Sequence, residues 1–201
     1  MINNADKFEI GGMLNRKLLV YCIKFIAAYC ILYYGSQAII GLSAPGGYYS
    51  RFVHDYLNYP ALLRKGLLKC SQVFLEMMGY KTEMPDEYKI KMVGGKGVRM
   101  VYSCLGIGVS SFWAAFMLAN ETDIKKKLFF ILFGIIFIFL INVGRIMLLF
   151  ITANKGQKMP FGIEHHTLFT VASYILIILL IFIFDRSEKR SVLFSTKNEK
   201  Q

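Results

Sequence analysis

The sequence lacks the signatures of several common functional classes. Its 201 residues contain no zinc-finger spacing, no Walker loop and no basic-aromatic strand pattern typical of nucleic-acid binding. No internal repeat is evident, and the four cysteines do not form a disulfide-dense scaffold. Acidic residues are scarce, with 13 Asp and Glu against 24 Lys and Arg, so the formal net charge is +11.

Apolar residues are abundant instead. They make up 55% of the chain and include 17 Phe, which is the composition of a membrane protein. The Lys and Arg residues lie mostly between apolar runs, so membrane topology and anionic lipid headgroups account for the positive charge. We therefore expect contact with membrane lipid and no nucleic-acid partner.

Four apolar runs predict an all-α fold, a polytopic bundle of about four transmembrane helices in a single membrane domain. The expected spans are 18–42, 101–119, 128–152 and 167–184. The first run is longer than the apolar region of about 7–15 residues in a secretory signal, so we expect it to be retained. The third run is long enough to cross about 30 Å of hydrocarbon at about 1.5 Å per residue.

The long loop 43–100 contains a predicted amphipathic helix. After Pro60, apolar residues recur every three or four positions until the helix ends at Gly79. The apolar stripe consists of Leu63, Leu67, Cys70, Phe74 and Met77. The predicted polar side carries Arg64, Lys65 and Lys69.

A small β-hairpin is predicted after this helix. Apolar and charged residues alternate from Tyr88 to Val93, which is typical of a strand. Gly94–Gly97 predicts a turn, and residues 98–102 form either a second strand or the start of the next helix.

The orientation follows from the basic clusters nearest to the spans. An even number of spans places both termini on one side, and Lys and Arg are equally numerous on the two sides. The clusters closest to span ends, Lys125–Lys127 and Arg186–Arg190, favour the cytoplasm. We therefore expect an inner-membrane protein with an extracytoplasmic loop and a cytoplasmic tail, 185–201.

Three chemically useful groups are predicted to meet at one membrane face. Cys104 begins the second span, Arg145 lies near the end of the third, and His165 and His166 begin the fourth. Because neighbouring spans run antiparallel and are joined by short links, the start of the second span, the end of the third and the start of the fourth lie at the same membrane face. Arg145 either snorkels to the interface or faces the protein interior, where its charge meets a partner.

Such a set fits nucleophilic catalysis. A thiolate is a nucleophile, a cation favours it, and a histidine can protonate the leaving amine. Arg145 could stabilise an oxyanion, Glu164 could orient a histidine, and Gly106 allows close backbone approach.

Simpler interpretations stay open for each member of the set. Cys104 could be a buried small residue, or could form a disulfide with Cys70 if the loop is outside the cytoplasm. The histidine pair could lie at the interface or bind a metal, although no third ligand is obvious.

These residues resemble the exosortase/archaeosortase family, as a short, four-span variant of a bacterial exosortase. The matching motifs are Cys104–Ile107, the Asn142–Ile146 segment with Arg145, and Glu164–His166, in that chain order. The resemblance implies catalysis by Cys104, Arg145 and His165 or His166, supported by Glu164, Asn142 and Gly106, without metal or cofactor. The position of Glu164 favours His165, and both histidines are kept as candidates.

The resemblance also implies a substrate. Such enzymes are thought to cleave a C-terminal sorting tag of exported proteins, made of a short motif, a membrane helix and a basic end. The protein is left as a thioester on the cysteine and passes to an amine or to water. The expected function is therefore that of a cysteine protease or transpeptidase.

Two other classes remain. One is a non-enzymatic membrane assembly factor for export of surface polymer or protein, which would keep its function after Cys104→Ser. The other is a metal-dependent intramembrane hydrolase that uses Glu164 and the histidines, which would be sensitive to chelators.

Overall fold

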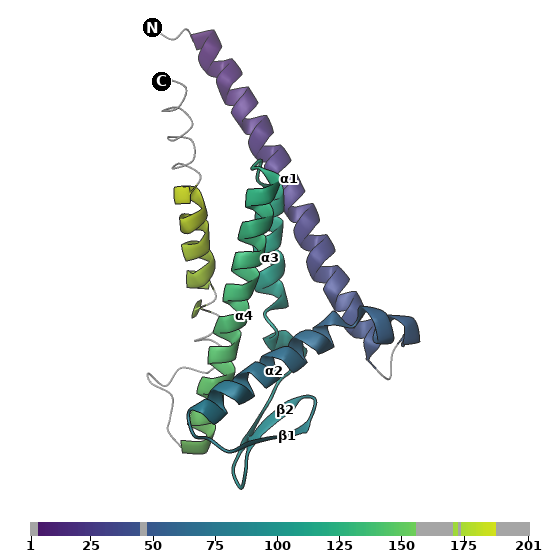
Figure 1. The fold of residues 1–201 in the computed structure, drawn as a ribbon. Coiled ribbons are helices and arrows are strands. Elements are labelled where there is room, and N and C mark those ends of the chain that lie inside the picture. The colour runs from purple at the N-terminus through teal and green to yellow at the C-terminus, as the bar shows by residue number, and fades with distance from the viewer. Residues whose placement is uncertain (1–3, 45–47, 156–170, 173, 188–201) are drawn as a thin grey trace. The chain divides into compact units, whose positions relative to one another are not determined.

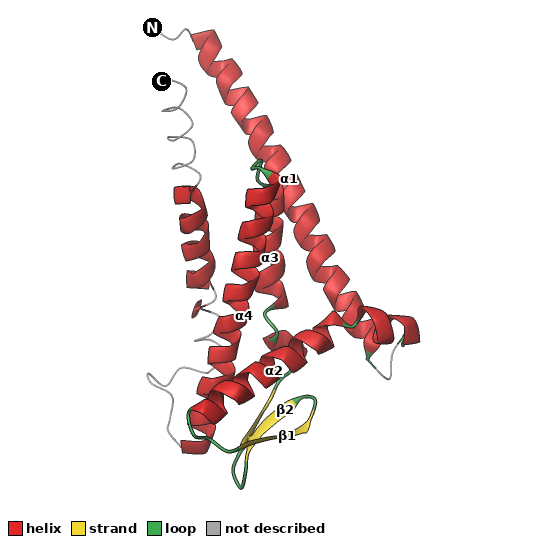
Figure 2. Ribbon diagram, viewed as in Figure 1, coloured by secondary structure: helices red, strands yellow, loops and turns green. Residues whose placement is uncertain are grey.

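The chain is mostly helical, with one small sheet (Figures 1 and 2). The computed structural model describes residues 4–44, 48–155, 171–172 and 174–187, and side chains from Arg16 onward. The helices are α1 (Asn4–Ser43), α2 (Tyr59–Met77), α3 (Ile107–Ala119) and α4 (Ile124–Lys155), and residues 171–172 and 174–187 are also helical. The strands are β1 (Thr82–Asp86), β2 (Lys89–Met92) and β3 (Gly97–Arg99). Two short turns complete the order, a π-helical turn at Val53–Leu57 and a 3-10 turn at Tyr102–Cys104.

Two of the described helices are long and apolar enough to cross a membrane. They are the Arg16–Ser43 part of α1 and the whole of α4. At about 1.5 Å per residue, the 13 residues of α3 reach only about 20 Å. The expected span at 167–184 lies partly outside the described residues, so the arrangement of four spans stays a prediction.

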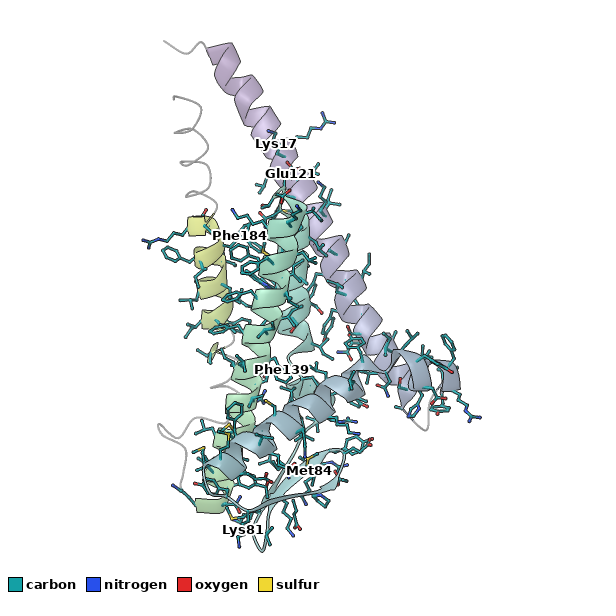
Figure 3. All side chains as sticks on the ribbon, viewed as in Figure 1. Lys17, Lys81, Met84, Glu121, Phe139 and Phe184 are labelled. Atoms are coloured by element: carbon teal, nitrogen blue, oxygen red, sulfur yellow. The ribbon has the colours of Figure 1, made fainter. Side chains whose placement is uncertain are left out.

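The chain divides into two compact units, 1–58 with 110–135, and 59–109 with 136–201. In the first unit, α1 packs against α3 through aromatic rings. The ring centroids of Phe25 and Phe112 are 5.2 Å apart, and those of Tyr21 and Phe116 are 6.4 Å apart. Near the α3–α4 link, where Figure 3 labels Glu121, that carboxylate lies 3.4 Å from the Lys24 Nζ atom.

In the second unit, α2 packs against an antiparallel sheet with the order β1-β2-β3 (Figure 1). Ile90 pairs with Val98 across the β2–β3 ladder and is fully buried. Lys89 and Lys91, the residues on either side of Ile90 along β2, are the charged residues of the alternating pattern that predicted this strand. The C-terminal half of α4 also lies in this unit, where the Phe139 ring is 3.9 Å from the Cβ position at Gly66 (Figure 3).

The predicted hairpin is confirmed by β2 and β3, but the sheet has a third strand that was not expected. Strand β1 contains Pro85 and acidic residues rather than an apolar alternation. A proline, which has no N–H group, is tolerated at a sheet edge, and β1 is an edge strand. The ladder to β2 shifts register between Glu83 and Asp86, around the proline.

The predicted amphipathic helix is present, but its buried face differs from the expected stripe. Met77 and Phe74 are exposed, whereas Leu68, Ser71 and Leu75 are fully buried. The buried face is therefore rotated by roughly a quarter turn relative to the expected one. Arg64, which was expected on the polar side, therefore lies on the buried face, and only 2% of it is exposed.

Two helix starts also differ from expectation. The helix α1 begins at Asn4, within the polar segment that precedes the first apolar run. The helix α3 begins at Ile107 rather than at residue 101, because Gly106 has a φ of +73°, which lies outside helical geometry. Residues 101–106 are thereby free to form the turn that carries Cys104.

Candidate functional site

Cys104 ends a single 3-10 turn just before α3. The Cys104 N–H donates to the Val101 carbonyl at 3.0 Å, and the Leu105 N–H donates to the Tyr102 carbonyl at 3.2 Å. Gly106 then reverses the backbone in the left-handed region, which glycine adopts without a steric penalty. Cys104 is thus presented on a turn, with a partly exposed side chain, rather than inside a helix.

Arg145 on α4 points its guanidinium at this turn. Its Nη2 atom donates to the Cys104 Sγ atom over 3.4 Å, and the Arg145 side chain is partly buried. The two residues are 41 positions apart in sequence. Of the two interpretations of Arg145, the structure therefore supports the interior one, in which the charge faces a partner inside the protein.

Asn142, one helical turn before Arg145, holds the residue that follows the cysteine. Its Nδ2 atom donates to the Leu105 carbonyl at 3.4 Å, and Asn142 is buried. A Cβ atom at Gly106 would collide with the same Nδ2 atom. The Asn142 amide therefore packs directly against the backbone at Gly106, while the catalytic role of Gly106 stays a prediction.

Glu164, His165 and His166 lie outside the described residues, so their roles stay predictions. The thiols of Cys70 and Cys104 are both free, so the structure contains no disulfide between them.

Arg64 is a further charged residue beside this turn, although it was expected on the polar side of α2. Its Cζ atom lies 3.8 Å from the centroid of the Tyr88 ring and 4.7 Å from that of Tyr102. Tyr102 belongs to the same 3-10 turn as Cys104. The sequence signal that could have indicated these contacts is the pair of tyrosines that flanks the β2–β3 hairpin, although no local periodicity connects them to α2.

Asn154 is a second residue that sequence reasoning missed. Its Oδ1 atom accepts from the Lys96 N–H at 2.8 Å, and its Nδ2 atom donates to the Lys96 carbonyl at 3.2 Å. Both contacts are to backbone, so Asn154 ties the β2–β3 turn to the end of α4. This connection fixes the sheet relative to the helix that carries Arg145 and Asn142.

The described arrangement places a cation against a candidate nucleophile, because the Arg145 guanidinium lies at hydrogen-bond distance from the Cys104 sulfur. A sulfur is nucleophilic in its anionic form. The same cation is placed to meet negative charge that develops on a carbonyl oxygen after attack. Among the described residues, no group of three or more His, Cys, Asp and Glu could hold a metal ion.

Comparison with known proteins agrees with the motifs that the site contains. The family model described as Transmembrane exosortase (Exosortase_EpsH) matches residues 12–184, which is most of the chain and includes every residue of the candidate site. Searches of curated proteins and of solved structures give no match.

Proposed function

Since the chain belongs to the transmembrane exosortase family, we propose that it is a membrane-embedded cysteine protease or transpeptidase. Its substrates would be exported proteins that carry a C-terminal sorting signal made of a short motif, a membrane helix and a basic end. The observation that carries this proposal is the contact of 3.4 Å between the Arg145 guanidinium and the Cys104 thiol. A cation on a nucleophile is the minimum that thiolate chemistry requires.

In the proposed reaction, the Cys104 thiolate attacks the carbonyl carbon of the scissile peptide bond. Arg145 first stabilises the thiolate and then the oxyanion of the tetrahedral intermediate. His165 or His166 protonates the nitrogen as the C–N bond breaks, which leaves a thioester on Cys104 and releases the tag as an amine. An acceptor amine or water then attacks the thioester and restores the thiol.

Supporting roles follow from the contacts around the turn. Asn142 and Gly106 hold the backbone after Cys104 in place, so the sulfur keeps its position relative to Arg145. Glu164 precedes the two histidines and is proposed to orient whichever of them is catalytic.

We also propose four spans in the inner membrane, near 18–42, 101–119, 128–152 and 167–184. The loop 43–100 and the active site would face the extracytoplasmic side, and the tail 185–201 the cytoplasm. Exposed Leu, Ile and Phe residues along α1 and α4 support contact with lipid, since apolar side chains on the outside of long helices suit hydrocarbon.

The test is processing of tagged proteins from the same cell. Cys104→Ala should leave every such protein at its full, uncleaved length, and wild type should accumulate a hydroxylamine-sensitive adduct on Cys104 if acceptor is withheld. Cys70→Ala is the matched control, because Cys70 is another free, partly exposed cysteine in the same unit, and it should process normally.

The same experiment separates the other two classes. Normal export in Cys104→Ser would contradict a thioester mechanism and favour an assembly factor. Loss of processing on treatment with a chelator, with recovery on adding metal, would favour a metal-dependent hydrolase.

A further inference from the structure

The side chain of Arg64 is buried without the partners that a guanidinium normally has. It is 2% exposed, and its Nε and Nη1 atoms have no hydrogen-bond partner among the described residues. The rings of Tyr88 and Tyr102 attract the cation through their π faces, but a ring face offers no acceptor in the plane of the guanidinium. Its N–H groups therefore lack the acceptors that buried donors almost always have.

Among the described residues, no carboxylate forms an ion pair with Arg64. Arg99 lies at the same tyrosine, with its Cζ atom 5.8 Å from the Tyr88 centroid. The ion pairs of the described part of the chain include neither Arg64 nor Arg99. Two guanidinium groups thus share one ring with no described carboxylate at ion-pair distance from either, which favours an anionic ligand.

The position of Arg64 connects it to the candidate nucleophile. Tyr102 stacks on Arg64 and lies two residues before Cys104 in the same turn. Tyr88, the other ring, is 37% exposed, so the guanidinium lies one ring below the surface. Through Tyr102, Arg64 is therefore in contact with the turn that carries the candidate nucleophile.

We propose that Arg64, held between Tyr88 and Tyr102, binds a carboxylate of the protein substrate, on an Asp or Glu side chain close to the cleaved bond. This inference rests on the proposed function and adds a specificity determinant to it. A carboxylate fits because its two oxygens match the planar fork of the guanidinium and supply the missing acceptors. Its charge also offsets the buried cation.

The experiment begins with the substrate. In a tagged protein that the wild-type enzyme processes, each Asp or Glu before the membrane helix is replaced in turn by Asn or Gln. One of these neutral substitutions should lower the processing rate at least about tenfold, as expected for a hydrogen bond to a charged group. If no acidic residue matters to the wild-type enzyme, the proposal is wrong, whatever the Arg64 variants do.

The second step tests whether Arg64 is the residue that binds the acidic side chain of the substrate. Arg64→Gln should process the acidic and the neutral substrate at the same low rate, so that the ratio of the two rates falls to about one. Lys65→Gln is the matched control, since Lys65 is the exposed neighbour on α2 and should keep the full ratio. An Arg64→Gln enzyme that still prefers the acidic substrate would overturn the assignment.

Two further outcomes are informative. A uniform loss of processing in Arg64→Gln, combined with no acid dependence in wild type, would indicate a structural role or a lipid phosphate as ligand, and would also overturn the proposal. Failure of the proposed function itself would look different, because wild type and Cys104→Ala would then leave tagged proteins equally intact.

Discussion

Substitutions of Arg145 can distinguish a catalytic role of this residue from a structural one. Arg145→Lys keeps the positive charge but loses the planar fork that lets one side chain reach both a sulfur and an oxyanion. We expect normal insertion and a loss of about 10²–10³ in processing rate, the usual cost of an oxyanion donor. The measurement is the rate of cleavage of a tagged substrate, normalised to the amount of protein in the membrane.

Arg145→Met extends this test, because it removes a charge that is costly in a membrane. Its protein level should therefore not fall, yet cleavage should be abolished. Normal processing by an abundant Arg145→Met protein would end the catalytic interpretation of this residue.

The histidines give a second prediction at this scale. His165→Ala should reduce processing more than His166→Ala, because the resemblance places the acid Glu164 directly before the catalytic histidine. Both variants are compared with wild type at equal protein level. The reverse order would show that His166 is the catalytic histidine, while the role of Cys104 and Arg145 would be unaffected.

The contact between Cys104 and Arg145 could be predicted from sequence, whereas the burial of Arg64 could not. The first follows from topology alone, because short links between antiparallel helices place the start of one beside the end of the next. Arg64 is buried because Tyr88 and Tyr102 cover it, and those rings come from two turns that lie well beyond α2 in the chain. Helical periodicity within α2 contains no information about them.

At the level of elements, the α3–α4 packing depends on a glycine. Trp113 is fully buried and its Nε1 atom donates to the Phe130 carbonyl at 2.9 Å, with the indole lying where a Cβ atom of residue 134 would be. Gly134→Ala should therefore destabilise the protein by about 1–3 kcal/mol, the usual cost of overpacking. Thermal unfolding in detergent measures this effect.

Gly144→Ala is the control on the same helix. No atom lies within 4 Å of a Cβ at that position, so the substitution should leave the unfolding temperature unchanged or raise it slightly through helix propensity. Equal effects of the two substitutions would contradict the packing of Trp113 against Gly134.

Asn154 gives a second prediction for the elements. Asn154→Ala removes both hydrogen bonds to the Lys96 backbone, each of which contributes about 0.5–1.5 kcal/mol. Amides of residues 92–97 should then exchange with deuterium faster, while those of α2 should not change. Thr152→Ala is the control, since its hydroxyl bonds only within α4, and it should leave exchange in the turn unaltered.

Helices with a strong apolar period were predictable, and the edge of the sheet was not. The strands β2 and β3 follow from an alternating pattern and a glycine-rich turn. Strand β1 forms because β2 presents a row of backbone groups to pair with. Its own sequence, with Pro85 and the acids Glu83 and Asp86, contains no strand signal. The same limit applies to the start of α3, which depends on the left-handed Gly106 rather than on the apolar run around it.

For the whole molecule, helix lengths indicate how deep the site lies. If α3 ends near one membrane surface, its length of about 20 Å leaves the preceding Cys104 turn about 10 Å short of the other surface, given about 30 Å of hydrocarbon. Arg145 lies roughly 15 Å along the axis from the end of α4 at Lys155. With α3 placed in this way, the Cys104 turn would lie below the membrane surface, where a low dielectric strengthens electrostatic interactions.

The side on which this site opens is the last prediction. Lys125–Lys127 begin α4 directly after the short link from α3, and basic residues next to spans favour the cytoplasm. The β2–β3 turn should therefore face outward. In a protein without its native cysteines, Lys96→Cys should react with an impermeant maleimide on intact cells, because Asn154 holds only the backbone of that residue. Lys126→Cys should react only after the inner membrane is opened, and the opposite pattern would invert the topology.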